Sequence, residues 1–165
     1  MSVPSVVNPF FDSERHAPEG FRALRALLGR QAGAGRLGLS LWELPPGEAA
    51  YPYHFHLLDE ELIVVLRGRP SLRTPEGWRE LAEGEVVSFP TGEGGAHQLV
   101  NWGEETVRFL ALSTSGTPEL VVYPDAGKMG ATERRPDGFS VRIEIPEETD
   151  VDYWRGETPP RRPTG

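Results

Sequence analysis

The chain has 165 residues, which is enough for one domain that buries most of its apolar surface without disulfide bonds. It contains no cysteine, so a disulfide framework, a thiolate zinc site and a cysteine nucleophile are all excluded. The formal net charge of −8 disfavours a nucleic-acid-binding protein, since such proteins concentrate positive charge.

The N-terminal part of the chain carries few strong signals. Residues 1–10 lack the basic start and the apolar stretch of a secretory signal, and the longest apolar run, residues 62–66, is too short to span a bilayer. We therefore expect a cytoplasmic protein that makes no contact with a membrane. Residues 21–30 have the composition of a short helix, but glycine-punctuated apolar runs surround them, so we predict a strand there.

Short apolar runs then follow one another, separated by glycine and proline. The 19 glycines and 16 prolines are spread along the chain instead of being gathered in one linker. The pattern predicts strands at residues 37–41, 53–57, 61–67, 71–74, 78–81, 85–89, 97–101, 106–112, 120–123 and 139–145. Residues 75–77, Pro-Glu-Gly, predict a hairpin turn. The pacing is typical of an all-β sandwich or barrel.

The end of the chain differs from the rest. Residues 146–152 are acidic, and residues 158–165 are rich in proline and arginine, so we expect this tail to be disordered. Tyr153 and Trp154 are large apolar residues, for which packing on the domain or on a neighbouring subunit is favoured over a binding site. We therefore expect an N-terminal arm with strands that pack on a barrel (1–35), the barrel core (36–123), a C-terminal extension (124–157) and the tail (158–165).

Two of the four histidines form the pair His54-Phe55-His56. Alternate residues of a strand point to one face about 7 Å apart, so these two imidazoles can share a metal ion. A tight bend at residues 57–59 would bring the next strand back alongside, with Glu61 facing the same interior. With His97, the set of three imidazoles and one carboxylate suits a first-row divalent metal. The histidine pair alone is a weak signal.

The spacing of these residues and of the glycines near them strengthens the prediction of a metal site. A first pattern, G-x(6)-H-x-H-x(4)-E-x(6)-G, is formed by Gly47, His54, His56, Glu61 and Gly68. A second begins after fifteen intervening residues and is formed by Gly84, Pro90, Gly92, His97 and Asn101. Together, across residues 36–113, they resemble the two motifs of the cupin superfamily, in particular small single-domain bacterial cupins with the cupin_2-type conserved barrel. The first motif is one residue longer than usual before His54, and the second is two residues longer before His97.

The resemblance implies an all-β fold, a double-stranded β-helix or jelly-roll-like cupin barrel. It implies that His54, His56, Glu61 and His97 bind one divalent transition metal; Fe, Mn, Ni and Zn all suit such ligands. Related cupins include dioxygenases, isomerases, epimerases and decarboxylases. We expect a metal-dependent enzyme that acts on a sugar, a sugar phosphate or a hydroxy or keto acid, of isomerase or dioxygenase type. The alternative is a non-catalytic cupin that binds a metal or a small ligand.

Other polar residues near the motifs have separate interpretations. Glu60 has the opposite parity to Glu61, so we expect it in solvent. Asn101 is predicted to close a turn through side-chain hydrogen bonds. His16 is interpreted as an ordinary surface histidine. Arg67 shares the face of Glu61 at the far end of its strand, and it is our candidate for binding a substrate carboxylate or phosphate, with a solvated arginine as the favoured alternative.

The run at residues 62–66 is apolar on both faces of its strand. Both faces must therefore be covered, one by the barrel interior and the other by the N-terminal segment or by a second subunit. We expect a homodimer, with a small molecule as its ligand.

Overall fold

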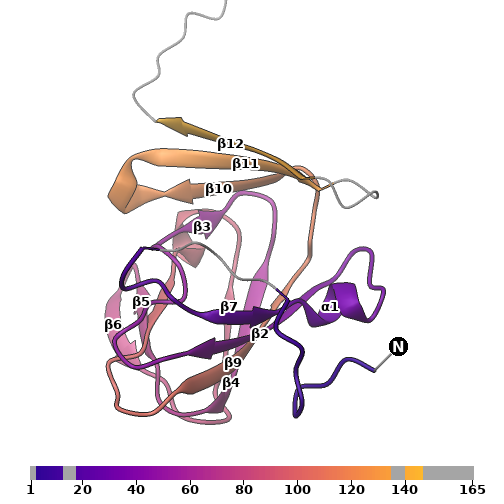
Figure 1. The fold of residues 1–165 in the computed structure, drawn as a ribbon. Helices are drawn as coiled ribbons and strands as arrows, with labels where there is room; N and C mark the ends of the chain where they lie inside the picture. The colour runs from indigo at the N-terminus through magenta and orange to yellow at the C-terminus, as the bar shows by residue number, and fades with distance from the viewer. Residues whose placement is uncertain (1–2, 13–17, 135–139, 147–165) are drawn as a thin grey trace, which may run out of the picture.

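The computed structural model describes residues 3–12, 18–134 and 140–146. Within these ranges the chain is built almost wholly of strands, as Figure 1 shows. The elements are β1 (Leu24–Ala26), α1 (Leu28–Gln31), β2 (Gly38–Leu44), β3 (Phe55–His56), β4 (Glu61–Arg67), β5 (Ser71–Thr74), β6 (Gly77–Glu80), β7 (Val86–Phe89), η1 (Glu93–Gly95), β8 (Gln98–Val100), β9 (Val107–Ser113), β10 (Glu119–Tyr123), η2 (Pro124–Ala126), β11 (Lys128–Arg134) and β12 (Ser140–Pro146). No helix among them is long and apolar enough to cross a membrane.

The described strands form three antiparallel sheets. Their orders are β1-β2-β9-β4-β7, β12-β11-β10-β3 and β6-β5-β8. Strands far apart in the sequence are neighbours, since β9 lies between β2 and β4, and β3 pairs with β10. In Figure 1 the layer formed by β10, β11 and β12 lies above the other two sheets. The prediction of an all-β, jelly-roll-like barrel is confirmed.

The interior of the barrel follows from strand alternation. Trp42 on β2, Ile63 on β4 and Phe109 on β9 are buried and point to the same side, together with Leu44 and Val65. The rings of Trp42 and Phe109 stack with centroids 6.0 Å apart. Alternate residues of these strands point outwards, as the period of two requires. This core fixes the register of β2, β9 and β4, and therefore the position of Glu61 at the start of β4.

The N-terminal segment covers part of the outer face of the same sheet. Leu41 on β2 is buried there with Ala26 and Leu28, and Phe11 and Leu66 pack against them. Leu66 of β4 is thus covered by the chain itself, which was one of the two alternatives for the outer face of residues 62–66.

The strand predicted for residues 21–30 is correct only in its middle. β1 ends at Ala26, and a one-turn helix begins at Leu28. The turn is stabilised by Asp12, whose carboxylate accepts the N–H of Leu27 at 2.8 Å. The close approach of Gly29 to β2 also matters, since a Cβ on Gly29 would lie 2.9 Å from the backbone nitrogen of Leu39. Contacts distant in the sequence therefore end the strand early.

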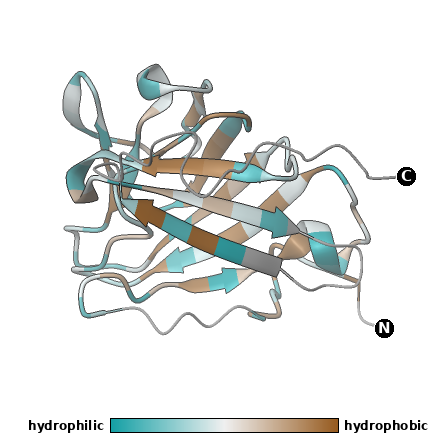
Figure 2. Cartoon of the chain, turned by 90° about the horizontal axis from the view of Figure 1, so that it is seen from above, coloured by the Kyte–Doolittle hydropathy of each residue, from teal (hydrophilic) through white to brown (hydrophobic). Residues whose placement is uncertain are grey.

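The C-terminal strands extend the sheet beyond the predicted set. β11 was not predicted, because its sequence contains charged residues, glycine and only isolated apolar side chains. β12 matches the strand predicted for residues 139–145. Its exposed Ile143 and Ile145 alternate with the polar Arg142 and Glu144. Figure 2 shows this alternation as bands on the strand nearest the viewer. The division of the chain at residues 35, 123 and 157 stays a prediction.

Asn101 has the structural role expected from its sequence position. Its amide nitrogen donates to the carbonyls of Leu44 and Glu105, both at 2.8 Å, and its Oδ1 accepts the N–H of Gly103 at 3.0 Å.

We expect Asn101→Ala to lower the free energy of unfolding by roughly 2–3 kcal/mol, because buried backbone groups lose their partners. Urea denaturation measures this. Asn8→Ala, the same change at an exposed site, should have little effect.

Candidate metal centre

Four polar side chains converge where the three sheets meet. His56 lies on β3, Glu61 begins β4, and His97 directly precedes β8. His54 directly precedes β3 and forms a backbone bridge with His97, with N–H to carbonyl distances of 3.2 and 2.9 Å. β3 and β4 belong to different sheets, so the bend at residues 57–59 carries the chain across the barrel and does not return it alongside.

The reactive nitrogens face a common point. His54 Nε2 lies 3.1 Å from His56 Nε2. Glu61 Oε2 lies 3.3 Å from His56 Nε2 and 3.2 Å from His97 Nε2. The donor atoms of His54, His56 and Glu61 all lie within 4.8 Å of one another, so these three residues could hold a metal ion. His97 contacts the same carboxylate oxygen, Oε2 of Glu61.

The other ring nitrogens are tied to the protein. His54 Nδ1 lies 2.9 Å from the carbonyl of Pro52, and His97 Nδ1 lies 2.9 Å from the carbonyl of Gly95. A carbonyl only accepts, so Nδ1 of each ring carries a proton, and in the neutral form of either ring Nε2 is the nitrogen with the free lone pair. His97 Nε2 is buried and makes no hydrogen bond of good geometry. This arrangement is typical of histidines that bind metal through Nε2.

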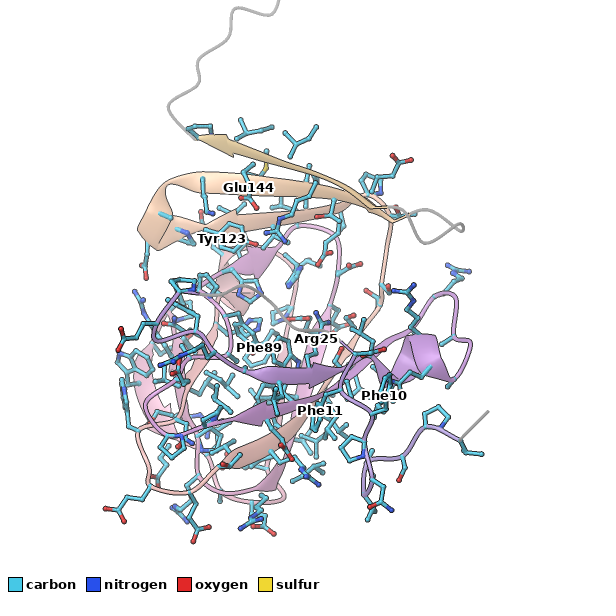
Figure 3. All side chains as sticks on the ribbon, viewed as in Figure 1. Phe10, Phe11, Arg25, Phe89, Tyr123 and Glu144 are labelled. Atoms are coloured by element: carbon cyan, nitrogen blue, oxygen red, sulfur yellow. The ribbon has the colours of Figure 1, made fainter. Side chains whose placement is uncertain are left out.

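Aromatic rings surround the imidazoles. Phe89 stacks on His97 with centroids 3.8 Å apart, and the edge of Tyr51 meets the rings of both His54 and His97. Tyr123 stacks on His54 at 6.0 Å. The cluster therefore lies between Phe89 and Tyr123, which Figure 3 labels inside the barrel and on β10 above it. The side chain of Glu61 is 19% exposed against at most 8% for His56 and His97, so the site is most open at Glu61.

Burial and charge move the pKa values of these groups in different directions. Burial, reinforced by the neighbouring His97 and His56, lowers the pKa of His54 to about 3. Burial also acts to lower the pKa of His56, but the carboxylates of Glu119 and Glu61 outweigh it and raise the pKa to about 9. Burial acts to raise the pKa of Glu61, but His56 and His97 hold it well below its usual range. Of these three groups, His56 therefore favours the positively charged form, His54 the neutral form and Glu61 the negatively charged form.

Two acidic residues that the sequence did not single out lie beside His56. Glu119, at the start of β10, has Oε1 3.3 Å from His56 Nδ1. Asp59 is buried in the bend after β3, and its Oδ1 accepts the N–H of Gly116 at 2.7 Å. The donor atoms of His56, Asp59 and Glu119 lie within 4.8 Å of one another. Glu119 belongs to neither motif, so nothing in the sequence pattern indicated it.

Other residues discussed from the sequence lie elsewhere. Arg67 stands about 20 Å from Glu61 along β4, given the usual rise of a strand. A bulge follows Val65, and the exposed guanidinium of Arg67 pairs with Glu105 at 3.7 Å. The substrate-binding role predicted for Arg67 therefore has no support from its position. Glu60 is exposed, as expected. His16 and the pair Tyr153 and Trp154 lie outside the described residues.

The chain is similar in sequence and in fold to known proteins. Residues 40–113 match the family model of the cupin domain. No curated protein matches the sequence. A solved structure from Acidithiobacillus ferrooxidans, provisionally assigned as a sugar phosphate isomerase, is 27% identical, with a TM-score of 0.68 over 81% of each chain. A cupin-superfamily sugar phosphate isomerase from Silicibacter pomeroyi is 21% identical, with a TM-score of 0.74 over 91% of this chain and 96% of its own. The polyketide cyclase RemF from Streptomyces resistomycificus is 29% identical, with a TM-score of 0.55 over 66% of this chain and 78% of its own.

In the metal-free protein, His56 should remain protonated at pH 8 while His54 remains neutral at pH 5. The raised pKa of His56 stabilises the fold fully below pH 6.5, and that contribution is lost as the pH rises through about 9. His54 acts in the opposite sense: its unfolded form takes up a proton below pH 6.5, so stability falls from there towards pH 3. NMR titration of the ring C–H signals tests both directions. Two titrations close to 6.5, the ordinary value, would contradict the described geometry.

Proposed function

We propose that the protein, whose residues 40–113 match the family model of the cupin domain, is a cupin-type, metal-dependent enzyme acting on a small oxygen-rich metabolite. The observation that carries the proposal is the cluster of His54, His56 and Glu61, whose donor atoms all lie within 4.8 Å of one another, with His97 Nε2 3.2 Å from Glu61 Oε2. In this proposal His54, His56, Glu61 and His97 hold one divalent transition metal.

The donor set supports a metal ion in three ways. His97 Nε2 is buried 3.2 Å from Glu61 Oε2 but makes no hydrogen bond of good geometry, and an unsatisfied buried nitrogen is costly unless a partner fills the site. The orientations of His54 and His97 are fixed by backbone carbonyls before any ion arrives. The two carboxylates beside His56 give the site a preference for positive charge. Three neutral imidazoles and a carboxylate suit Fe, Mn, Ni or Zn.

The chemistry follows from the surroundings of the site. An ion bound there would supply Lewis acidity towards an oxygen-containing ligand. The protein's own residues hold the imidazoles in place. The rings of Phe89, Tyr51 and Tyr123 pack against the imidazole rings of His54 and His97 and exclude water from them. Glu61 is the most exposed of the four residues, so the site is most open on its side.

The substrate class is proposed from chemistry and from similarity. Sugars, sugar phosphates and hydroxy or keto acids carry neighbouring oxygens that can chelate an ion. The similarity to the Acidithiobacillus protein, provisionally a sugar phosphate isomerase, supports an isomerase acting on a sugar phosphate. A dioxygenase reaction is the other possibility within this class. A substrate screen with the protein's own metal tests the activity, and loss of activity on chelation is expected.

A second candidate function is a cupin that binds a metal or a small ligand without catalysis. The observation in its favour is the burial of the three imidazoles, which are all less than a tenth exposed and enclosed by aromatic rings. A metal that binds tightly but exchanges no ligand with added sugar phosphates or hydroxy acids would favour this function over the enzyme.

His97→Ala should weaken metal binding at least tenfold and abolish most of the increase in Tm that metal produces, because a ligand from the second motif is lost. The Tm of the metal-free protein should change less. Differential scanning fluorimetry with and without Mn²⁺, Fe²⁺, Ni²⁺ or Zn²⁺ measures this. Wild-type protein that purifies without metal and shows no shift with any of these ions would contradict the proposal.

The matched control is His16→Ala, which removes the one histidine outside the two motifs. It should leave both the metal-induced shift and the metal content unchanged. An equal loss in both variants would show that the histidines bind metal without forming the described centre.

We also propose that the protein is a homodimer joined through the outer face of the β2-β9-β4 sheet. The N-terminal segment covers only part of this face. Beside it lies a groove of about 470 Å³ lined by Leu37, Leu39, Leu62 and Leu112. Leu37 is 69% exposed and Leu112 is 37% exposed. Apolar grooves of this kind favour association.

Leu112→Glu should convert the dimer to a monomer, because a charge would be buried in the interface. Light scattering should give twice the 18.2 kDa chain mass for the wild type and the chain mass for the variant. Ile143→Glu, an apolar-to-acidic change at an exposed position on β12, should leave the dimer intact. A wild type that is monomeric at micromolar concentration, or a dimer lost only in Ile143→Glu, would contradict the proposed interface.

A further inference from the structure

We propose that Glu119 is a positioning residue that fixes the ring of His56 for metal binding, and that Asp59 holds the loop that delivers Glu119. The inference rests on the proposed metal centre. It concerns two acids outside the ligand set, one on β10 and one in the bend between β3 and β4. Neither residue belongs to the sequence motifs.

The three imidazoles differ in what holds their outer nitrogen. His54 and His97 each meet a neutral backbone carbonyl at Nδ1. His56 Nδ1 is buried without a hydrogen bond of good geometry and instead lies 3.3 Å from Oε1 of Glu119, while its Nε2 lies 3.3 Å from Oε2 of Glu61. A carboxylate behind a histidine ligand sets which nitrogen carries the proton, orients the ring and makes the ligand more basic. His56 is therefore the imidazole whose binding strength depends most on one side chain.

The pairing of β10 with β3 brings Glu119 next to His56. Val121 on β10 pairs with His56 on β3, and the N–H of Leu57 donates to the carbonyl of Leu120 at 2.9 Å. Glu119 is two residues before Val121, so it lies on the same face of the sheet as His56. Its side chain is 14% exposed, which means that the contact with His56 is largely shielded from water.

Asp59 locks the loop that precedes Glu119. Its Oδ1 accepts the N–H of Gly116 at 2.7 Å and the hydroxyl of Thr114 at 3.4 Å. Thr114 is also bound to the backbone of Glu60, through its N–H at 3.1 Å and its hydroxyl oxygen at 3.1 Å. A Cβ at position 116 would lie 2.8 Å from Asp59 Oδ1, so this contact favours glycine there. The bend after β3 and the start of β10 are therefore held together on the outer side of His56.

A second metal ion between His56, Asp59 and Glu119 is the competing interpretation of the same three residues. It is less favourable on two grounds. Asp59 Oδ1 already accepts two hydrogen bonds from the loop. His56 would also have to give up the protons on both of its nitrogens, whereas a positioning role leaves the Nδ1 proton in place.

The test measures Zn²⁺ affinity by titration with a competing chelator, using the full chain. Glu119→Ala should lower the affinity roughly 10- to 100-fold, and Glu119→Gln, which keeps an acceptor but loses the charge, should lie between it and the wild type. Glu105→Ala and Glu105→Gln are the matched controls at an exposed glutamate, and both should keep wild-type affinity. Asp59→Asn should reduce affinity less than Glu119→Ala.

NMR of the ring protons supplies a readout that does not depend on activity. The wild type should show a hydrogen-bonded Nδ1–H signal from His56, assigned by its loss in His56→Ala. This signal should disappear in Glu119→Ala and return, shifted, in Glu119→Gln. A general loss of stability would not produce this selective rescue.

The following results would contradict the proposed role of Glu119. Wild-type affinity in both Glu119 variants, or an unchanged Nδ1–H signal in Glu119→Ala, would overturn the positioning role alone. Two Zn²⁺ ions per chain, one of them lost in Glu119→Ala, would replace it with the second metal site. Absence of Zn²⁺ uptake by the wild type would overturn the proposed function, and with it the positioning role.

Discussion

The burial of three imidazoles and a carboxylate at one point is the constraint around which the barrel is built. Unpartnered polar groups in a protein interior cost several kcal/mol each. The chain meets this cost by tying His54 and His97 to backbone carbonyls and by placing Glu61 against His56 and His97. Two buried imidazole nitrogens, His97 Nε2 and His56 Nδ1, make no hydrogen bond of good geometry. A cluster of this kind could hold a metal ion.

The fold brings together residues that are distant in sequence by making the three sheets meet at this point. His56 arrives on β3, Glu61 on β4 and Glu119 on β10, and the backbone bridge between His54 and His97 joins the region of β3 to that of β8. The apolar core below sets the register of β4 and hence the position of Glu61. Loss of register in any of these strands would separate the donors. Fold and site are thus specified by the same pairings.

The sequence pattern predicted an all-β sandwich or barrel because turn residues and strand alternation are local signals, and the resemblance of its two motifs to those of cupins implied the barrel. The four candidate ligands were predicted for a different reason: the spacing of the two motifs is local, even though His97 is distant from His54. Glu119 and Asp59 were missed because their relation to His56 arises only from the pairing of β3 with β10 and from the loop contact at Gly116. A bulge after Val65 breaks the simple alternation of β4, so the face on which Arg67 lies could not be inferred from that of Glu61. The helix at Leu28 depends on Asp12 and on the approach of Gly29 to β2, which no local pattern reveals.

The central claim is that one divalent ion binds between the three imidazoles and Glu61. Anomalous X-ray diffraction from crystals grown with Mn²⁺, Fe²⁺ or Zn²⁺ tests it most directly. The account predicts a single anomalous peak in the barrel, at about 2.0–2.3 Å from the Nε2 atoms of His54, His56 and His97 and from a carboxylate oxygen of Glu61. Metal-soaked crystals with no peak at this position, or with the peak only between His56, Asp59 and Glu119, would contradict it.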